Sequence, residues 1–85
     1  MSGYTFTTDQ AEIITGPAVS RILGDAVAQE VAAAFERAEP DAEGNRTVDL
    51  GEHRTAILAA LREISPDTID ATRQQTTEQL IRTLA

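Results

Sequence analysis

The sequence predicts an all-α fold, a compact bundle of about four helices in a single domain spanning residues 1–85. Three observations predict it. Apolar residues recur at helical spacing in separate segments. Prolines and capping residues mark helix starts, and the connections are short except for 39–48, which favours antiparallel neighbours. The expected helices are about 9–15, 17–38, 50–64 and 66–84, after a possible short extended N-terminal segment.

The first seven residues alternate weakly between apolar and polar types. Tyr4 and Phe6 would face one side of an extended segment, with threonines on the other side. Two interpretations are open. Either the two aromatic rings cover one end of the core, or residues 1–7 form a short strand that pairs with its copy in a dimer.

The first predicted helix, about 9–15, follows a capping-box pattern. Thr8 and Asp9 are capping residue types, and Glu12 lies three positions after Asp9. The next helix is expected to begin at Pro17, because a proline in the first turn loses no hydrogen bond and presets φ.

Segment 17–38 is predicted to be one long helix with a wide apolar face, ended by Pro40. At about 100° per residue its apolar side chains cover an arc of about 220°, whereas a surface helix needs little more than ~100°. We therefore expect neighbours on two sides, from the rest of the chain or from a second chain. The residues on this arc are Val19, Ile22, Leu23, Ala26, Val27, Val31, Ala33, Ala34, Phe35 and Ala38.

The second half of this arc is the expected surface for self-association or partner binding. The last segment is too polar between Thr72 and Gln79 to cover it well. Its alanines indicate either high helix propensity with tight internal packing, or the contact face of a homodimer. The predicted partner or dimer interface consists of Val27, Glu30, Val31, Ala34, Phe35 and Ala38.

Glu30 is the charged residue that lies well inside the apolar arc. A buried carboxylate requires a partner. We expect a pair with Arg54, at the edge of the apolar stripe of helix 50–64, or exposure at a gap in the packing. The alternative is a polar contact that sets partner choice in a dimer.

The third helix, about 50–64, is expected to start from a second capping box formed by Asp49 and Glu52. Its apolar stripe consists of Leu50, Ile57, Leu61 and Ile64. Ser65-Pro66-Asp67 is a start signal for the last segment, 66–84, which is either one loosely packed helix or two helices.

The composition excludes several classes of function. The chain has 14 acidic residues against 7 basic ones, a net charge of −7, which argues against a generic nucleic-acid surface. The acidity favours solubility, protein partners with basic patches, or a salt-rich cytoplasm. It has no cysteine, and no run of about 18 apolar residues could span a membrane. The N-terminus lacks the pattern of a signal peptide, so we expect a cytoplasmic protein.

No pattern predicts catalysis, a metal site, a cofactor or a small-molecule substrate, so we expect no enzyme activity. His53 is the single histidine, and a general base would need an oriented nucleophile and a second polar group beside it. We expect it to be a boundary residue that bonds to the backbone or caps the 39–48 loop.

Two stretches resemble known DNA-associated families. RTVDLGEHRTAIL, 46–58, resembles the strand and first helix of ribbon–helix–helix antitoxins and repressors, and TTEQLIRTL, 76–84, looks like their second helix. This resemblance implies a dimer whose paired strands read the major groove, with Thr47 among the contacts. PAVSRILGDA, 17–26, and GNRTV, 44–48, resemble parts of archaeal histones, from which no functional residue is carried over.

These observations predict a small acidic, non-enzymatic helical module for protein–protein interaction or assembly, which self-associates as a homodimer or binds a protein partner. The alternative is a small dimeric DNA-binding regulator of ribbon–helix–helix or antitoxin type.

Overall fold

The computed structural model describes residues 3–64, 67 and 69–85. Within them the chain is mostly helical, as predicted, but a small antiparallel sheet means that the fold is not all-α. No helix in this part of the chain is both long enough and apolar enough to cross a membrane. The elements, in chain order, are β1 (Gly3–Phe6), α1 (Thr8–Ile14), α2 (Pro17–Leu23), α3 (Asp25–Arg37), β2 (Arg46–Asp49), α4 (His53–Glu63) and α5 (Ala71–Leu84).

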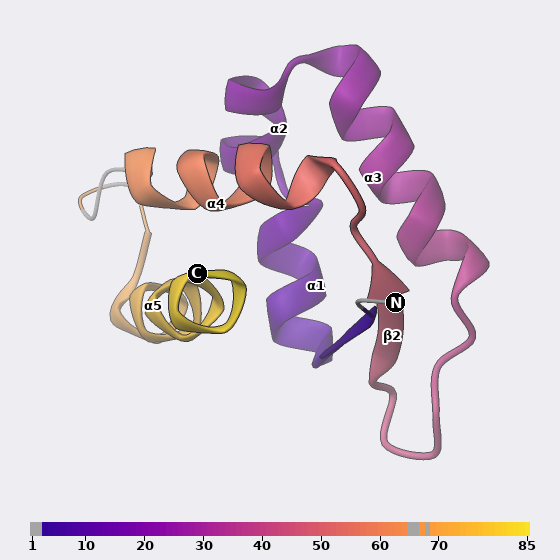
Figure 1. Ribbon diagram of the computed structural model, residues 1–85. Coiled ribbons are helices and arrows are strands. Elements are labelled where there is room, and N and C mark those ends of the chain that lie inside the picture. The colour runs from indigo at the N-terminus through magenta and orange to yellow at the C-terminus, as the bar shows by residue number, and fades with distance from the viewer. Residues whose placement is uncertain (1–2, 65–66, 68) are drawn as a thin grey trace.

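Helix α1 lies in the middle of the molecule, between α5 on one side and β2 on the other (Figure 1). Helix α5 packs against α1 and α4, and α2 packs against α3 and α4. Helix α3 packs mainly against α2 and β2, so it forms one edge of the fold (Figure 1). The core contains Phe6, Ile14, Val19, Val31, Phe35, Val48, Leu50, Ile57, Ala60, Leu61, Leu80 and Leu84.

The two strands are antiparallel, with Tyr4 opposite Val48 and Thr5 opposite Thr47. Side chains alternate across a strand, so Phe6 is buried in the core together with Val48. The two threonines are exposed, and their hydroxyl oxygens lie 2.9 Å apart. The extended N-terminal segment is therefore present, and it pairs with β2 of its own chain.

The predicted single helix 17–38 is wrong, because it is broken at Gly24. Gly24 adopts a φ of 89° and a ψ of 157°, a conformation that is open almost only to glycine. It ends α2 and begins α3. The two halves of the apolar arc therefore lie on separate axes, and each half can be covered by different neighbours.

Helix α1 begins one residue earlier than predicted, with a different cap. The capping box consists of Thr7 and Gln10, not of Thr8, Asp9 and Glu12. The Thr7 hydroxyl accepts a hydrogen bond from the Gln10 amide at 3.2 Å, and the Gln10 side chain accepts one from the Thr7 amide at 3.0 Å. Thr7 and Gln10 are three residues apart, and this is the spacing that a capping box requires.

Pro17 begins α2, as predicted. The preceding Gly16 is required by a close approach: a Cβ at this position would lie 2.7 Å from the carbonyl oxygen of Glu12. The chain can therefore turn tightly from α1 into α2 only because position 16 has no side chain.

Helix α4 begins at His53, three residues later than predicted, and the second capping box is absent. The Asp49 carboxylate accepts a hydrogen bond from the Gly51 amide at 2.9 Å, which stabilises a turn before the helix. Glu52 precedes the helix without a side-chain capping bond. The turn places Leu50 in the core instead of on the helix.

Helix α5 begins at Ala71, where the Asp70 carboxylate accepts a hydrogen bond from the Arg73 amide at 2.8 Å. The predicted start at Ser65 and Pro66 lies outside the described residues. The polar middle of α5 packs because Thr77, 6% exposed, donates its hydroxyl hydrogen to the Arg73 carbonyl of its own helix.

Candidate functional site

Five of the six residues of the predicted interface contact the chain's own core. Val31 and Phe35 are buried in it. Val27, Ala34 and Ala38 are half-buried against it. The use of these side chains at an interface with a second chain stays a prediction.

The sixth residue, Glu30, is 66% exposed and pairs with a histidine. Its Oε2 lies 2.8 Å from Nε2 of His53, the first residue of α4. The predicted pair with Arg54 is wrong, because the Arg54 guanidinium donates a hydrogen bond to the carbonyl of Leu84. The Glu30–His53 pair links α3 to α4. No hydroxyl group in the described part of the chain is recorded as bonded to His53.

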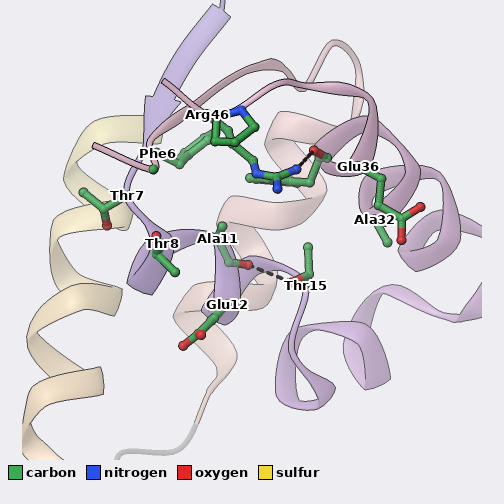
Figure 2. Close-up of a pocket in the computed structure, with 12 residues that line it drawn as sticks. Phe6, Thr7, Thr8, Ala11, Glu12, Thr15, Ala32, Glu36 and Arg46 are labelled. Carbon is green, nitrogen blue, oxygen red and sulfur yellow. Dashed lines mark hydrogen bonds between the residues drawn. The ribbon is translucent and has the colours of Figure 1, made fainter. Parts of the chain in front are cut away.

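The candidate site is a pocket of about 450 Å³ between α1, α3 and β2, which we call the Arg46 pocket (Figure 2). This volume lies within the range of about 300–1,000 Å³ that is usual for ligand pockets. The pocket is lined by Phe6, Thr7, Thr8, Ala11, Glu12, Thr15, Ala32, Phe35, Glu36, Pro40, Gly44 and Arg46.

Two aromatic rings form the apolar base of the Arg46 pocket. Phe6 is the last residue of β1, and Phe35 lies in the last turn of α3. The ring centroids are 5.4 Å apart with the rings tilted by 43°, within the range that aromatic pairs prefer. Both rings are also part of the core, so the base is held rigidly by the packing of the whole fold.

Arg46 anchors the top of the pocket to the end of α3. Its Nη1 donates hydrogen bonds to the carbonyl oxygens of Phe35 at 2.7 Å and Ala38 at 3.1 Å. Carbonyls in the last turn of a helix lack partners within the helix and carry partial negative charge, so a cation is favoured there. The Nε and Nη2 of Arg46 have no partner among the described residues.

Two carboxylates belong to the lining, one from each helix beside the pocket. Glu12 of α1 and Glu36 of α3 lie on different sides of it (Figure 2). Both residues are exposed. Neither carboxylate forms an ion pair within the described part of the chain. The ion pair recorded there joins Glu30 and His53.

The hydroxyl groups of the lining differ in their availability. Thr15 donates its hydroxyl hydrogen to the Ala11 carbonyl at 2.8 Å (Figure 2), and the Thr7 hydroxyl caps α1. The Thr8 hydroxyl has no partner among residues 3–64, 67 and 69–85. The pocket therefore offers a free hydroxyl group beside its apolar base.

The lining of the Arg46 pocket contains neither histidine nor cysteine. In the part of the chain that the structure describes, no group of three or more His, Cys, Asp or Glu residues is placed to hold a metal ion. What remains is an aromatic base, a guanidinium with free N–H groups and two carboxylates without a cationic partner.

A second pocket, of about 600 Å³, lies between α1, α2 and the start of α5. Arg21 and Arg73 belong to its lining together with Asp70. Its lining also includes Ile64 and Ile69, and between these two residues the structure describes only Asp67. The candidate site is therefore the Arg46 pocket, whose lining is described throughout.

Neither the role of Arg46 nor the pocket was predicted from the sequence. One signal for Arg46 was present: in RTVD, 46–49, strand alternation places it on the same face as the buried Val48. A charged residue on an inward face needs a partner. Nothing in the sequence connects Arg46 with Phe6 and Ala11, which approach it only through the pairing of β1 with β2.

Segment 46–49 is extended, as the ribbon–helix–helix resemblance implies, but its observed strand partner is β1 of the same chain. Comparison with models of protein families, with curated proteins and with solved structures found no match.

Proposed function

We propose that this protein is a non-enzymatic protein–protein interaction module that binds a partner through the Arg46 pocket. The observation that supports this proposal is the pocket itself. Two core phenylalanines form its base, and Arg46 lines it with unpaired N–H groups. Interface residues that dominate binding energy are enriched in aromatic residues and arginine and lie in pockets from which water is excluded.

The alternative of a DNA-binding regulator has less support from the geometry. In that family the outward face of the paired strands contacts the bases. Here the exposed side chains on that face are Thr5, Thr47 and Asp49, none of which is a cation. A net charge of −7 further opposes binding to a phosphate backbone.

Photo-crosslinking in the cell that encodes this chain tests the proposal. A photoreactive phenylalanine analogue replaces Glu36 beside the pocket and, as the control, Glu78, which is exposed on α5 and does not line it. We expect a discrete covalent adduct from position 36 that is absent from position 78. The mass of the adduct distinguishes a second copy of the chain from a different protein.

A pocket-filling variant provides the second control. Ala32 lines the pocket but does not pack against the core, so Ala32→Met fills the pocket without overpacking the interior. We expect Ala32→Met to abolish the adduct and Ala33→Met, on the same helix but outside the pocket, to retain it. The same adducts from both crosslinker positions, or none from position 36, would contradict the proposal.

A further inference from the structure

The charges around the Arg46 pocket are mostly negative and unpaired. Glu12 and Glu36 have no cationic partner among the described residues. The adjoining segment 36–45 carries four carboxylates and one arginine. A partner that approaches this surface therefore meets an acidic border, which attracts positively charged segments and raises their association rate.

The guanidinium of Arg46 is compatible with a cationic partner because its charge is already partly offset. Its Nη1 lies against the carbonyls of Phe35 and Ala38, at the negative end of α3. The free Nε and Nη2 are hydrogen-bond donors without a partner in the described chain. A backbone carbonyl of an extended peptide would accept hydrogen bonds from them.

The base of the pocket selects an apolar side chain. The half-buried Ala11 and Ala32 present carbon surface to the pocket, while the rings of Phe6 and Phe35, 1% and 5% exposed, add little accessible area of their own. A polar group placed there would lose hydrogen bonds to water without replacement. The lining thus combines three requirements: an apolar anchor, a backbone carbonyl beside Arg46, and a positive charge beside Glu12 or Glu36.

We infer that the Arg46 pocket recognises a basic segment of a partner protein, with one large apolar side chain seated against Ala11 and Ala32 and flanking lysines or arginines beside Glu12 and Glu36. This inference rests on the proposed function. The partner is a protein other than a second copy, because a second copy brings its own net charge of −7 to an acidic surface.

A peptide titration followed by NMR of the backbone amides tests this chemistry. The ligand is an acetylated and amidated heptapeptide, Gly-Lys-Lys-Leu-Lys-Lys-Gly. We expect a Kd of about 0.1–1 mM, weak because a short flexible peptide loses conformational entropy on binding. The largest shifts are expected at Thr8, Ala11 and Ala32.

Two altered peptides separate the anchor from the charge. Replacing the leucine with alanine is expected to weaken binding about tenfold, since most of the apolar contact is lost. Replacing the four lysines with glutamates is expected to abolish binding. Higher salt is expected to weaken binding of the lysine peptide, because exposed charges are screened over about 8 Å at 0.15 M ionic strength.

Protein variants assign the binding to this pocket. Ala32→Met is expected to weaken binding of the peptide at least about tenfold, while Ala33→Met is expected to leave the Kd unchanged. The double variant Glu12→Gln with Glu36→Gln is expected to weaken it about fivefold. Its control has the same net charge: Glu63→Gln with Glu78→Gln, two exposed residues outside the pocket. Unfolding midpoints confirm that each variant is folded.

The outcomes separate this inference from the proposed function. An equal loss of binding in the two glutamine double variants, or unchanged binding in Ala32→Met, would overturn the inference. If the peptide does not bind while the crosslink at position 36 forms, the partner chemistry is wrong and the interaction function stands. If both fail, the interaction function falls as well.

Discussion

Arg46 shows how a single side chain connects the fold to the site. Its backbone belongs to β2, while its guanidinium binds the carbonyls of Phe35 and Ala38 at the end of α3. Hydrogen bonds from a charged donor are stronger than neutral ones, so this contact fixes the end of α3 against the sheet. The same side chain keeps two unused nitrogens in the pocket lining.

Gly24 determines where the helical segment 17–38 breaks. A continuous helix would be stabilised by about 0.5–1 kcal/mol in Gly24→Ala, because glycine is a poor helix former. At the observed φ of 89° and ψ of 157°, the same substitution is expected to destabilise the protein instead.

We therefore expect Gly24→Ala to lower the free energy of unfolding by about 1–3 kcal/mol, the cost of forcing a side chain into this backbone region. No atom would clash with the new Cβ, so the effect isolates backbone strain. Urea unfolding followed by circular dichroism measures it. A stabilised Gly24→Ala would show that α2 and α3 form one helix in solution.

At the scale of elements, the start of α1 was predicted within one residue, but its cap was assigned to the wrong side chains. Several capping residue types follow one another in TTDQAE, 7–12, and sequence alone does not choose among overlapping boxes. The choice depends on which residue leaves the strand with an extended backbone. Because β1 ends at Phe6, this is Thr7, with φ −73° and ψ 168°.

The cap gives a matched pair of variants. Thr7→Ala removes the hydroxyl that accepts from the Gln10 amide, and we expect it to destabilise the protein by about 0.5–2 kcal/mol. Thr8→Ala, the next residue, removes a hydroxyl without a partner in the described chain and is expected to change stability by less than about 0.5 kcal/mol. Chemical denaturation at matched concentration compares the two. Equal effects, or a larger one for Thr8→Ala, would contradict the cap at Thr7.

At the scale of the whole molecule, self-association is a proposal separate from binding at the Arg46 pocket, and we place it at the junction of α2 and α3. Helix α3 forms an edge of the fold (Figure 1). Ile22 lies in the last turn of α2, beside the break at Gly24. Among the described residues it is the large apolar side chain that is exposed, at 40%. A chain of this size buries only about 60–65% of its unfolded surface, so association is a common source of further burial.

We expect light scattering to report a mass of twice 9.1 kDa at high protein concentration. We also expect the Tm to rise between about 10 and 500 µM protein, as binding of a second copy to the folded state requires. Ile22→Asp is expected to shift the equilibrium toward the monomer. A monomer at every concentration, with a constant Tm, would remove self-association and leave the binding of a different protein as the function to test.

The features that were predicted correctly are those with a local signal. Pro17 as the start of α2 and the helical spacing of Ile57 and Leu61 depend on neighbours within a few residues, and both are confirmed. The predicted pair Glu30–Arg54 is wrong because it depends on contacts between elements distant in the chain. The Arg54 guanidinium bonds to the Leu84 carbonyl, and the side chain that pairs with Glu30 is His53.

By itself, the sequence determined that this protein is a small, acidic and mainly helical chain, because helical spacing, proline positions and net charge are all properties of local sequence. Only the tertiary structure decided the sheet and the Arg46 pocket. Both need residues about 40 positions apart, such as Phe6 and Arg46, to meet. That meeting is set by the burial of the whole core, in which the tilted rings of Phe6 and Phe35 pack against each other and against residues from several other elements.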